Sequence, residues 1–145
     1  MVERTATVNW TGNLFQGKGN VTSGTGVLSS QPVTWAARTA EPEGMTSPEE
    51  LIAAAHASCY AMAFSNVLDG NGTPPESLDV TATVGFGPKD GGGMEVKHSK
   101  LQVVGKVPGL SADDFSRLAA EGELGCPVSN ALRNNVAITV EAKLA

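Results

Sequence analysis

The chain has 145 residues, 41% hydrophobic and 17% charged, which is typical of one folded domain with a buried core. The net charge is −5 and Lys and Arg form no cluster, so neither nucleic acid nor an anionic membrane is expected as a partner. The apolar stretch 51–64 is interpreted as too short to cross a bilayer, and the first residues lack the apolar core of a secretion signal. We therefore expect a cytoplasmic protein. Because no repeat or linker interrupts the chain, one domain over residues 1–145 is predicted.

The N-terminal third predicts β-strands. Ala6, Val8 and Trp10 alternate with polar residues, which is the pattern of a strand with one apolar face. A turn is expected at residues 11–13, and a second strand is expected from Leu14. Residues 33–37 are a candidate third strand, and residues 41–47 are expected to form a loop.

The following segment predicts a helix. Ser47 is a candidate N-cap, Pro48 suits the first helical position, and Glu50 completes a capping box. No side chain from residue 51 to 64 carries a permanent charge, and the helix is expected to end within residues 69–72. A helix that is apolar on all sides must be covered by protein. One small domain can hardly cover it, so we expect a homodimer.

The second half predicts strands that alternate with two helices. Apolar residues alternate over 78–86, the glycine-rich stretch 90–93 predicts a hairpin turn, and a partner strand is expected over 94–103. Ser111 is expected to open a helix that stops by residue 125, and Cys126 with Pro127 is expected to open a short helix. The last strand is expected over 136–144. The fold class is α+β with mainly antiparallel sheet.

The two cysteines are the candidate chemical groups. Cys59 lies within the apolar helix, where an inert core residue and a reactive thiol are about equally plausible readings. Cys126 lies at a helix start, where unpaired N–H groups would stabilise a thiolate. Two cysteines cannot make a four-cysteine zinc site, and His56 and His98 show no ligand spacing with them. We expect neither a metal nor a cofactor.

Three further residues are candidates for the site. Arg38 ends an apolar segment, where its guanidinium needs a partner unless it lies at the surface. Glu49 is free to pair with another group, although it could simply stabilise the helix dipole. His56 precedes Cys59 by one turn, so a nucleophilic Cys-His pair has to be weighed. A histidine with partners in the core or at an interface is the favoured interpretation, and His98 is expected at the surface.

Residues 48–59 and 125–129 resemble the OsmC/Ohr family of thiol-dependent hydroperoxide reductases. The resemblance extends over nearly the whole chain, and His56 with the loop 39–44 is closer to the OsmC branch. It implies an intertwined homodimer with its sheets wrapped around central cysteine helices. It also implies a peroxidase in which Cys59 attacks the peroxide and Cys126 resolves the sulfenic acid to a disulfide, with Arg38 and Glu49 in the active site. Organic hydroperoxides and hydrogen peroxide are the implied substrates, and an external dithiol is the implied reductant.

Two other functions stay open. One is a hydrolase that uses Cys59 and His56, and the other is a non-catalytic dimeric protein that binds a small apolar ligand. Within the peroxidase hypothesis, Glu49 and Cys59 lie ten residues apart, which is about 15 Å along one helix. We therefore predict composite sites, in which one chain supplies Cys59 and Cys126 and its partner supplies Arg38 and Glu49.

Overall fold

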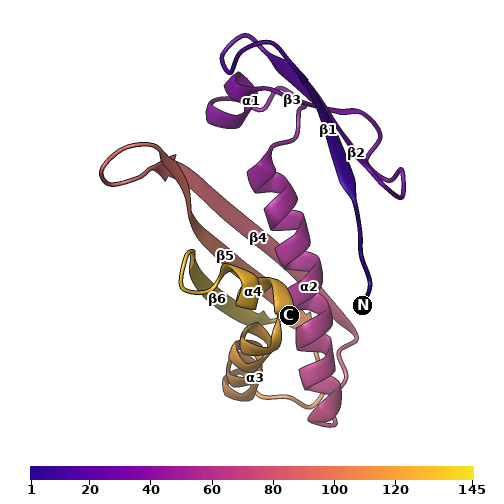
Figure 1. Cartoon of the computed structure of the whole chain (residues 1–145). Coiled ribbons are helices and arrows are strands. Elements are labelled where there is room, and N and C mark those ends of the chain that lie inside the picture. Colours follow the sequence, from indigo (N-terminus) through magenta and orange to yellow (C-terminus); the bar gives the residue numbers. More distant parts are fainter. The chain divides into compact units, whose positions relative to one another are not determined.

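A computed structural model describes all residues from 1 to 145 (Figure 1). The elements are β1 (Ala6–Thr11), β2 (Lys18–Ser23), β3 (Gln31–Val33), α1 (Trp35–Thr39), α2 (Pro48–Gly70), β4 (Ser77–Pro88), β5 (Met94–Lys106), α3 (Ala112–Gly125), α4 (Pro127–Leu132) and β6 (Ala137–Leu144). They fall into two compact units, residues 1–51 and residues 52–145, and the helix α2 belongs mostly to the second. A single domain over the whole chain stays a prediction.

The first unit is built on a three-stranded antiparallel sheet in the order β1-β2-β3. The second strand begins at Lys18 and not at Leu14, because residues 12–17 form the connecting turn. Gly12 adopts a left-handed φ of 86° there, a conformation that favours glycine. The predicted strand over 33–37 is wrong: the strand is β3, and the helix α1 follows it. The hydroxyl of Thr34 caps α1 by accepting from the Ala37 N–H at 3.1 Å.

The helix α2 begins as the sequence predicts. The N–H of Glu50 donates to the Ser47 hydroxyl at 3.1 Å, which confirms the N-cap. The carboxylate of Glu50 accepts from the Thr46 hydroxyl at 2.9 Å instead of from the Ser47 backbone N–H, so the predicted capping box is not closed. The helix ends at Gly70, inside the predicted range.

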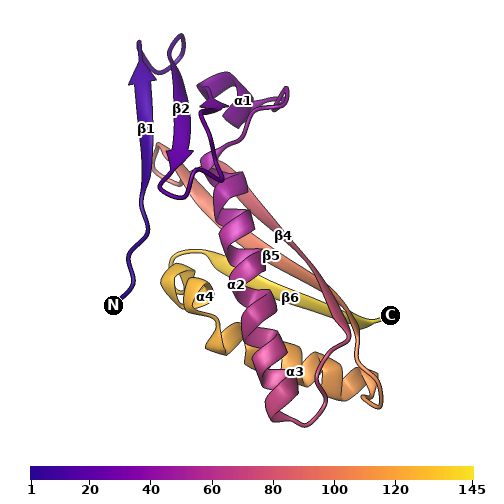
Figure 2. The ribbon, with the colours of Figure 1, turned by 90° about the vertical axis from the view of Figure 1, so that its right-hand side faces the viewer.

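The second unit is built on a three-stranded sheet in the order β4-β5-β6 (Figure 2). The strands β4 and β5 form the predicted antiparallel hairpin, with the turn at residues 89–93. The strand β6 pairs with β5 in parallel, with Leu101 opposite Val140. Three of the four strand pairings of the chain are antiparallel, which confirms the predicted fold class.

The core of the second unit lies between this sheet and the helices α2 and α3. The Phe64 ring packs against the Phe115 ring at 5.1 Å between centroids, and the Tyr60 hydroxyl donates to the Ala119 carbonyl at 3.0 Å. Gly105 of β5 leaves space for the Phe115 ring, which a Cβ at that position would overlap. The buried apolar residues of this core are Tyr60, Phe64, Leu68, Leu101, Val103, Val107, Phe115, Leu118, Ala119 and Cys126.

The helix α2 is longer than the expected apolar stretch. With 23 residues and a mean hydropathy of 1.4 over its most apolar window, it could cross a membrane by length and composition alone. The expectation concerned residues 51–64 alone, and α2 extends beyond that stretch at both ends. One face of the helix nevertheless lies in the core, because His56, Tyr60, Phe64 and Leu68 are fully buried within the chain.

Candidate active site

The two cysteines lie next to each other in the second unit. Cys59 is half-buried in the middle of α2, and Cys126 is fully buried at the N-cap of α4. Both are free thiols, and their side chains are hydrogen-bonded to each other. The structure therefore brings together the two residues that the sequence singled out, although they lie 67 positions apart in the chain (126 − 59).

The first turn of α4 directs its backbone N–H groups at both sulfur atoms. Pro127 occupies the first helical position and has no N–H, so Val128 and Ser129 supply the first free donors. The N–H of Ser129 donates to the Cys126 Sγ at 3.5 Å, and the N–H of Val128 donates to the sulfur of Cys59. Such donors stabilise a thiolate more than a thiol.

The pKa of Cys59 is the balance of opposing influences. Burial is the largest and raises the pKa above its ordinary value, because a buried site disfavours the charged thiolate. The Val128 N–H lowers the pKa, whereas the neighbouring Cys126 raises it further. Within one chain the thiol is therefore held protonated, and full activation calls for a nearby positive charge.

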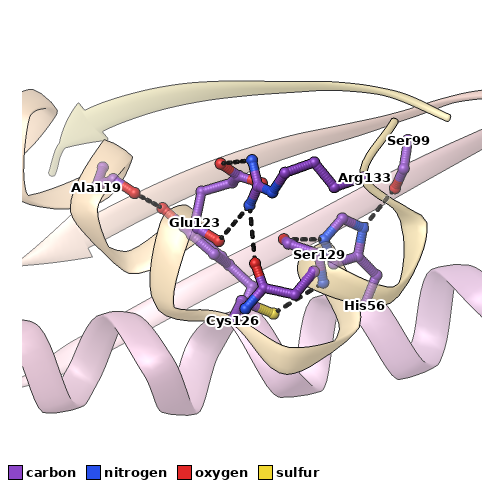
Figure 3. A network of polar contacts seen from close by, with 9 residues as sticks. His56, Ser99, Ala119, Glu123, Cys126, Ser129 and Arg133 are labelled. Carbon is purple, nitrogen blue, oxygen red and sulfur yellow. Dashed lines mark hydrogen bonds and ion pairs between the residues drawn. The ribbon is translucent and has the colours of Figure 1, made fainter. Parts of the chain in front are cut away.

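His56 is held between two buried serines (Figure 3). Its Nδ1 lies 2.6 Å from the Ser99 Oγ, and its Nε2 lies 2.7 Å from the Ser129 Oγ. Burial lowers the pKa of His56, and the Glu123 carboxylate opposes this shift only in part, which favours the neutral ring. Since both ring nitrogens are occupied, His56 cannot act as the base for Cys59. The interpretation of His56 as a core histidine with partners is confirmed.

A second polar contact joins the end of α3 to the end of α4. The Arg133 Nη2 lies 2.9 Å from the Glu123 Oε1 (Figure 3). The same Nη2 lies 3.2 Å from the Asn130 Oδ1. Glu123 is largely buried, with 12% of its side chain exposed, so this ion pair is better shielded than a surface one. Arg133, Glu123 and the two serines around His56 are not among the candidates that the sequence predicts. No local pattern marks these residues.

Arg38 and Glu49 pair with each other in the first unit. The Arg38 Nη2 lies 2.7 Å from the Glu49 Oε1, and the Arg38 Nε lies 3.1 Å from the Glu49 Oε2, which is a two-pronged contact. Glu49 is buried, and the Arg38 guanidinium also lies 6.0 Å from the centre of the Trp35 ring. The structure thus supports a positioning contact between them, and their catalytic role stays a prediction.

An apolar pocket lies in the first unit, with Arg38 in its wall. Its volume is about 490 Å³. The residues that line it are Ala6, Val8, Trp10, Leu14, Val21, Val33, Trp35, Arg38, Pro48 and Leu51. The pocket therefore combines a large apolar surface with one guanidinium, a setting that suits an apolar molecule with one polar end. No group of three or more His, Cys, Asp or Glu side chains is placed to hold a metal ion.

Comparison with known proteins agrees with the sequence and the fold. The family described as "OsmC-like protein" matches residues 41–141. Peroxiredoxin OsmC of Escherichia coli strain K12 is 36% identical over 142 residues, which is 98% of each chain. An organic hydroperoxide resistance protein of Xanthomonas axonopodis pv. citri is 30% identical over 66% of this chain and 65% of its own length. The crystal structure of OhrB of Bacillus subtilis superposes with a TM-score of 0.77 at 26% identity, covering 96% of this chain and 98% of that one. With the cysteine pair in place, these matches show that the chain belongs to the OsmC-like protein family.

Proposed function

We propose that the protein is a thiol-dependent peroxidase with two working cysteines, which reduces organic hydroperoxides and also hydrogen peroxide. The observation that carries the proposal is the contact between the reduced Cys59 and Cys126 at the start of α4. The names of the relatives, a peroxiredoxin and an organic hydroperoxide resistance protein, support the same reaction class.

The reaction has three balanced steps. The Cys59 thiolate attacks one peroxide oxygen, the O–O bond breaks, and the sulfur becomes a sulfenic acid while the other oxygen leaves as an alcohol or water. The Cys126 sulfur then attacks the Cys59 sulfur, and the hydroxyl leaves as water as the disulfide forms. An external dithiol returns both sulfurs to thiols and is itself oxidised to a disulfide.

Arg38 supplies the positive charge that the Cys59 thiolate needs, and Glu49 orients its guanidinium. The two-pronged contact between them, with Glu49 buried, supports the second role. Glu49 and Cys59 stand ten residues apart on α2, which is about 15 Å along the helix axis. We therefore assign Arg38 and Glu49 to the site that contains the cysteines of the partner chain.

A homodimer is supported by the surface of α2. Ala54, Ala55, Ser58 and Met62 form an exposed strip along this helix, and 69% of Met62 is accessible. A strip without charged side chains on so apolar a helix calls for a protein cover, and a second copy of the chain supplies one.

The apolar pocket beside Arg38 supports apolar hydroperoxides as the preferred substrates, since it can hold a carbon chain with the polar end at the guanidinium. Two free thiols also suit a reducing compartment, so a cytoplasmic enzyme that is reset by a dithiol is proposed.

The test is peroxide consumption with a dithiol reductant, for cumene hydroperoxide and for hydrogen peroxide. Cys59→Ser should abolish turnover. Cys126→Ser should still form the sulfenic acid on Cys59, detectable by a dimedone adduct, but should not form the disulfide. An unchanged rate in Cys59→Ser would overturn the proposal.

The apolar pocket favours one other candidate, a dimeric binding protein for a small apolar ligand. It requires that Cys59 react with peroxide no faster than a free cysteine does, so the same dimedone measurement separates the two. The hydrolase is not favoured, because Ser99 and Ser129 occupy both nitrogens of His56.

A further inference from the structure

The buried His56 connects three elements of the second unit. It lies on α2, bonds Ser99 of β5 through one ring nitrogen and bonds Ser129 of α4 through the other. All three side chains are fully buried, and the peroxidase steps above use none of them. Burying three polar groups is costly unless each is hydrogen-bonded, so this network fixes a definite arrangement of the three elements.

The same Ser129 also holds the resolving cysteine. Its hydroxyl bonds His56, while its backbone N–H donates to the Cys126 Sγ at 3.5 Å. The preceding residue, Val128, donates its N–H to the sulfur of Cys59. One residue therefore joins the imidazole to the helix turn that contacts both sulfurs.

The helix α4 needs such an anchor because it has only six residues. A helix this short is not stable by itself and takes its position from tertiary contacts. Arg133, just after α4, is held by Glu123, and Ser129 in the first turn is held by His56. The second anchor lies in the turn whose N–H groups contact both sulfurs, whereas the first reaches Cys126 only through the Glu123 carbonyl, which accepts the Cys126 N–H.

We propose that His56 is a positioning residue for disulfide formation: through Ser129 it holds the first turn of α4 so that the Cys126 sulfur faces the Cys59 sulfur. In the peroxidase, this places Cys126 to attack the sulfenic sulfur while the hydroxyl leaves as water. The inference deepens the proposed function and rests on it for the biological meaning of the disulfide. The positioning itself can be measured without peroxide.

The experiment uses the aromatic disulfide DTNB on the full-length reduced protein. The half-buried Cys59 attacks one DTNB sulfur and releases a coloured thiolate. Cys126 then attacks the Cys59 sulfur of the mixed disulfide and releases a second. The first phase reports the reactivity of Cys59 and the second reports the attack of Cys126. Loss of the second phase in Cys126→Ser verifies this assignment.

Ser129→Ala should slow the second phase about tenfold, a factor near the upper end of the net free-energy contribution of one hydrogen bond. The rate of the first phase should change by less than about threefold, because Cys59 remains in place. His56→Leu should act like Ser129→Ala, and His56→Gln, whose amide can still bond Ser129, should recover part of the rate.

Ser99→Ala is the matched control. It removes the other bond of the same imidazole, at an equally buried serine, but leaves the contact to α4. It should slow the second phase much less than Ser129→Ala does, although thermal unfolding should show similar losses of stability. Ser116→Ala, at an exposed position of α3, should change neither phase.

Equal slowing of the second phase by Ser129→Ala and Ser99→Ala would reduce His56 to a stabilising residue and overturn the inference, as would no slowing by either. If His56→Leu does not fold, the comparison of the two serines decides alone. If the unaltered protein shows both phases but consumes no peroxide, the proposed function fails while the positioning role stands.

Discussion

At the scale of single residues, the reactivity of Cys59 depends on what surrounds its sulfur. Burial and the Cys126 thiol favour the protonated form, whereas the Val128 N–H favours the thiolate. The alkylation rate of Cys59 by iodoacetamide should therefore rise with pH and level off only above the ordinary pKa of a cysteine.

Cys126→Ser should shift this alkylation profile to lower pH. The substitution removes the hydrogen bond and the charge interaction by which Cys126 raises the pKa of Cys59, so this pKa falls and more thiolate is present at a given pH. The control is Ser58→Ala, beside Cys59, whose hydroxyl donates to the Ala54 carbonyl and should leave the profile in place. A shift to higher pH in Cys126→Ser would contradict the prediction.

The raised pKa of Cys59 also makes its contribution to stability depend on pH. Its pKa is higher in the folded chain than in the unfolded one, so the folded state holds the proton more tightly. This contribution is complete below the unfolded pKa and is lost as pH rises through the folded pKa. The free energy of unfolding therefore falls, through Cys59, only when the pH rises above the unfolded pKa of the thiol.

At the scale of elements, the ion pair between Arg133 and Glu123 joins the ends of α3 and α4. Arg133→Met should lower the free energy of unfolding by about 1 kcal/mol, since it leaves a largely buried carboxylate without its partner. Arg133 is itself about one-third exposed, so a larger loss is not expected. Urea denaturation measures the change.

Arg117→Met is the matched control for this prediction. Arg117 makes two ion pairs on α3, with Asp114 and Glu121, but all three side chains are more than half exposed. Its loss should cost no more than about 0.5 kcal/mol. Equal losses in the two variants would show that burial of Glu123 does not strengthen the pair.

At the scale of the whole molecule, composite sites can be tested by mixing subunits. A heterodimer of a Cys59→Ser chain with an Arg38→Ala chain should regain one of two sites, so roughly half the activity of the unaltered dimer returns. Each parent homodimer should be inactive or strongly impaired. Peroxide consumption by purified, doubly tagged heterodimers measures the recovery.

A second heterodimer supplies the control. Cys59→Ser with Cys126→Ser should recover nothing, because one chain supplies both cysteines of each site. If the Arg38→Ala heterodimer also recovers nothing, all four residues act within one chain, and the assignment to the partner is wrong.

The sequence by itself determined the features that depend on neighbouring residues. Ser47 with Pro48 predicted the start of α2, the glycines at 91–93 predicted the hairpin, and Cys126 with Pro127 predicted the start of α4. Each is a local signal, because capping bonds and turn conformations involve residues only a few positions apart. The same local character explains the error at residues 33–37, where the capping hydroxyl of Thr34 outweighed a short apolar run.

Only the tertiary structure decided the contacts between distant residues. His56 could be recognised as a core histidine, but its partners Ser99 and Ser129 lie 43 and 73 positions away and carry no signal of their own. The parallel pairing of β5 with β6 was equally hidden, since alternating apolar residues look the same in either direction. The cysteines were visible in the sequence, whereas the α4 turn that faces both sulfurs exists only because α2, β5 and α4 pack together.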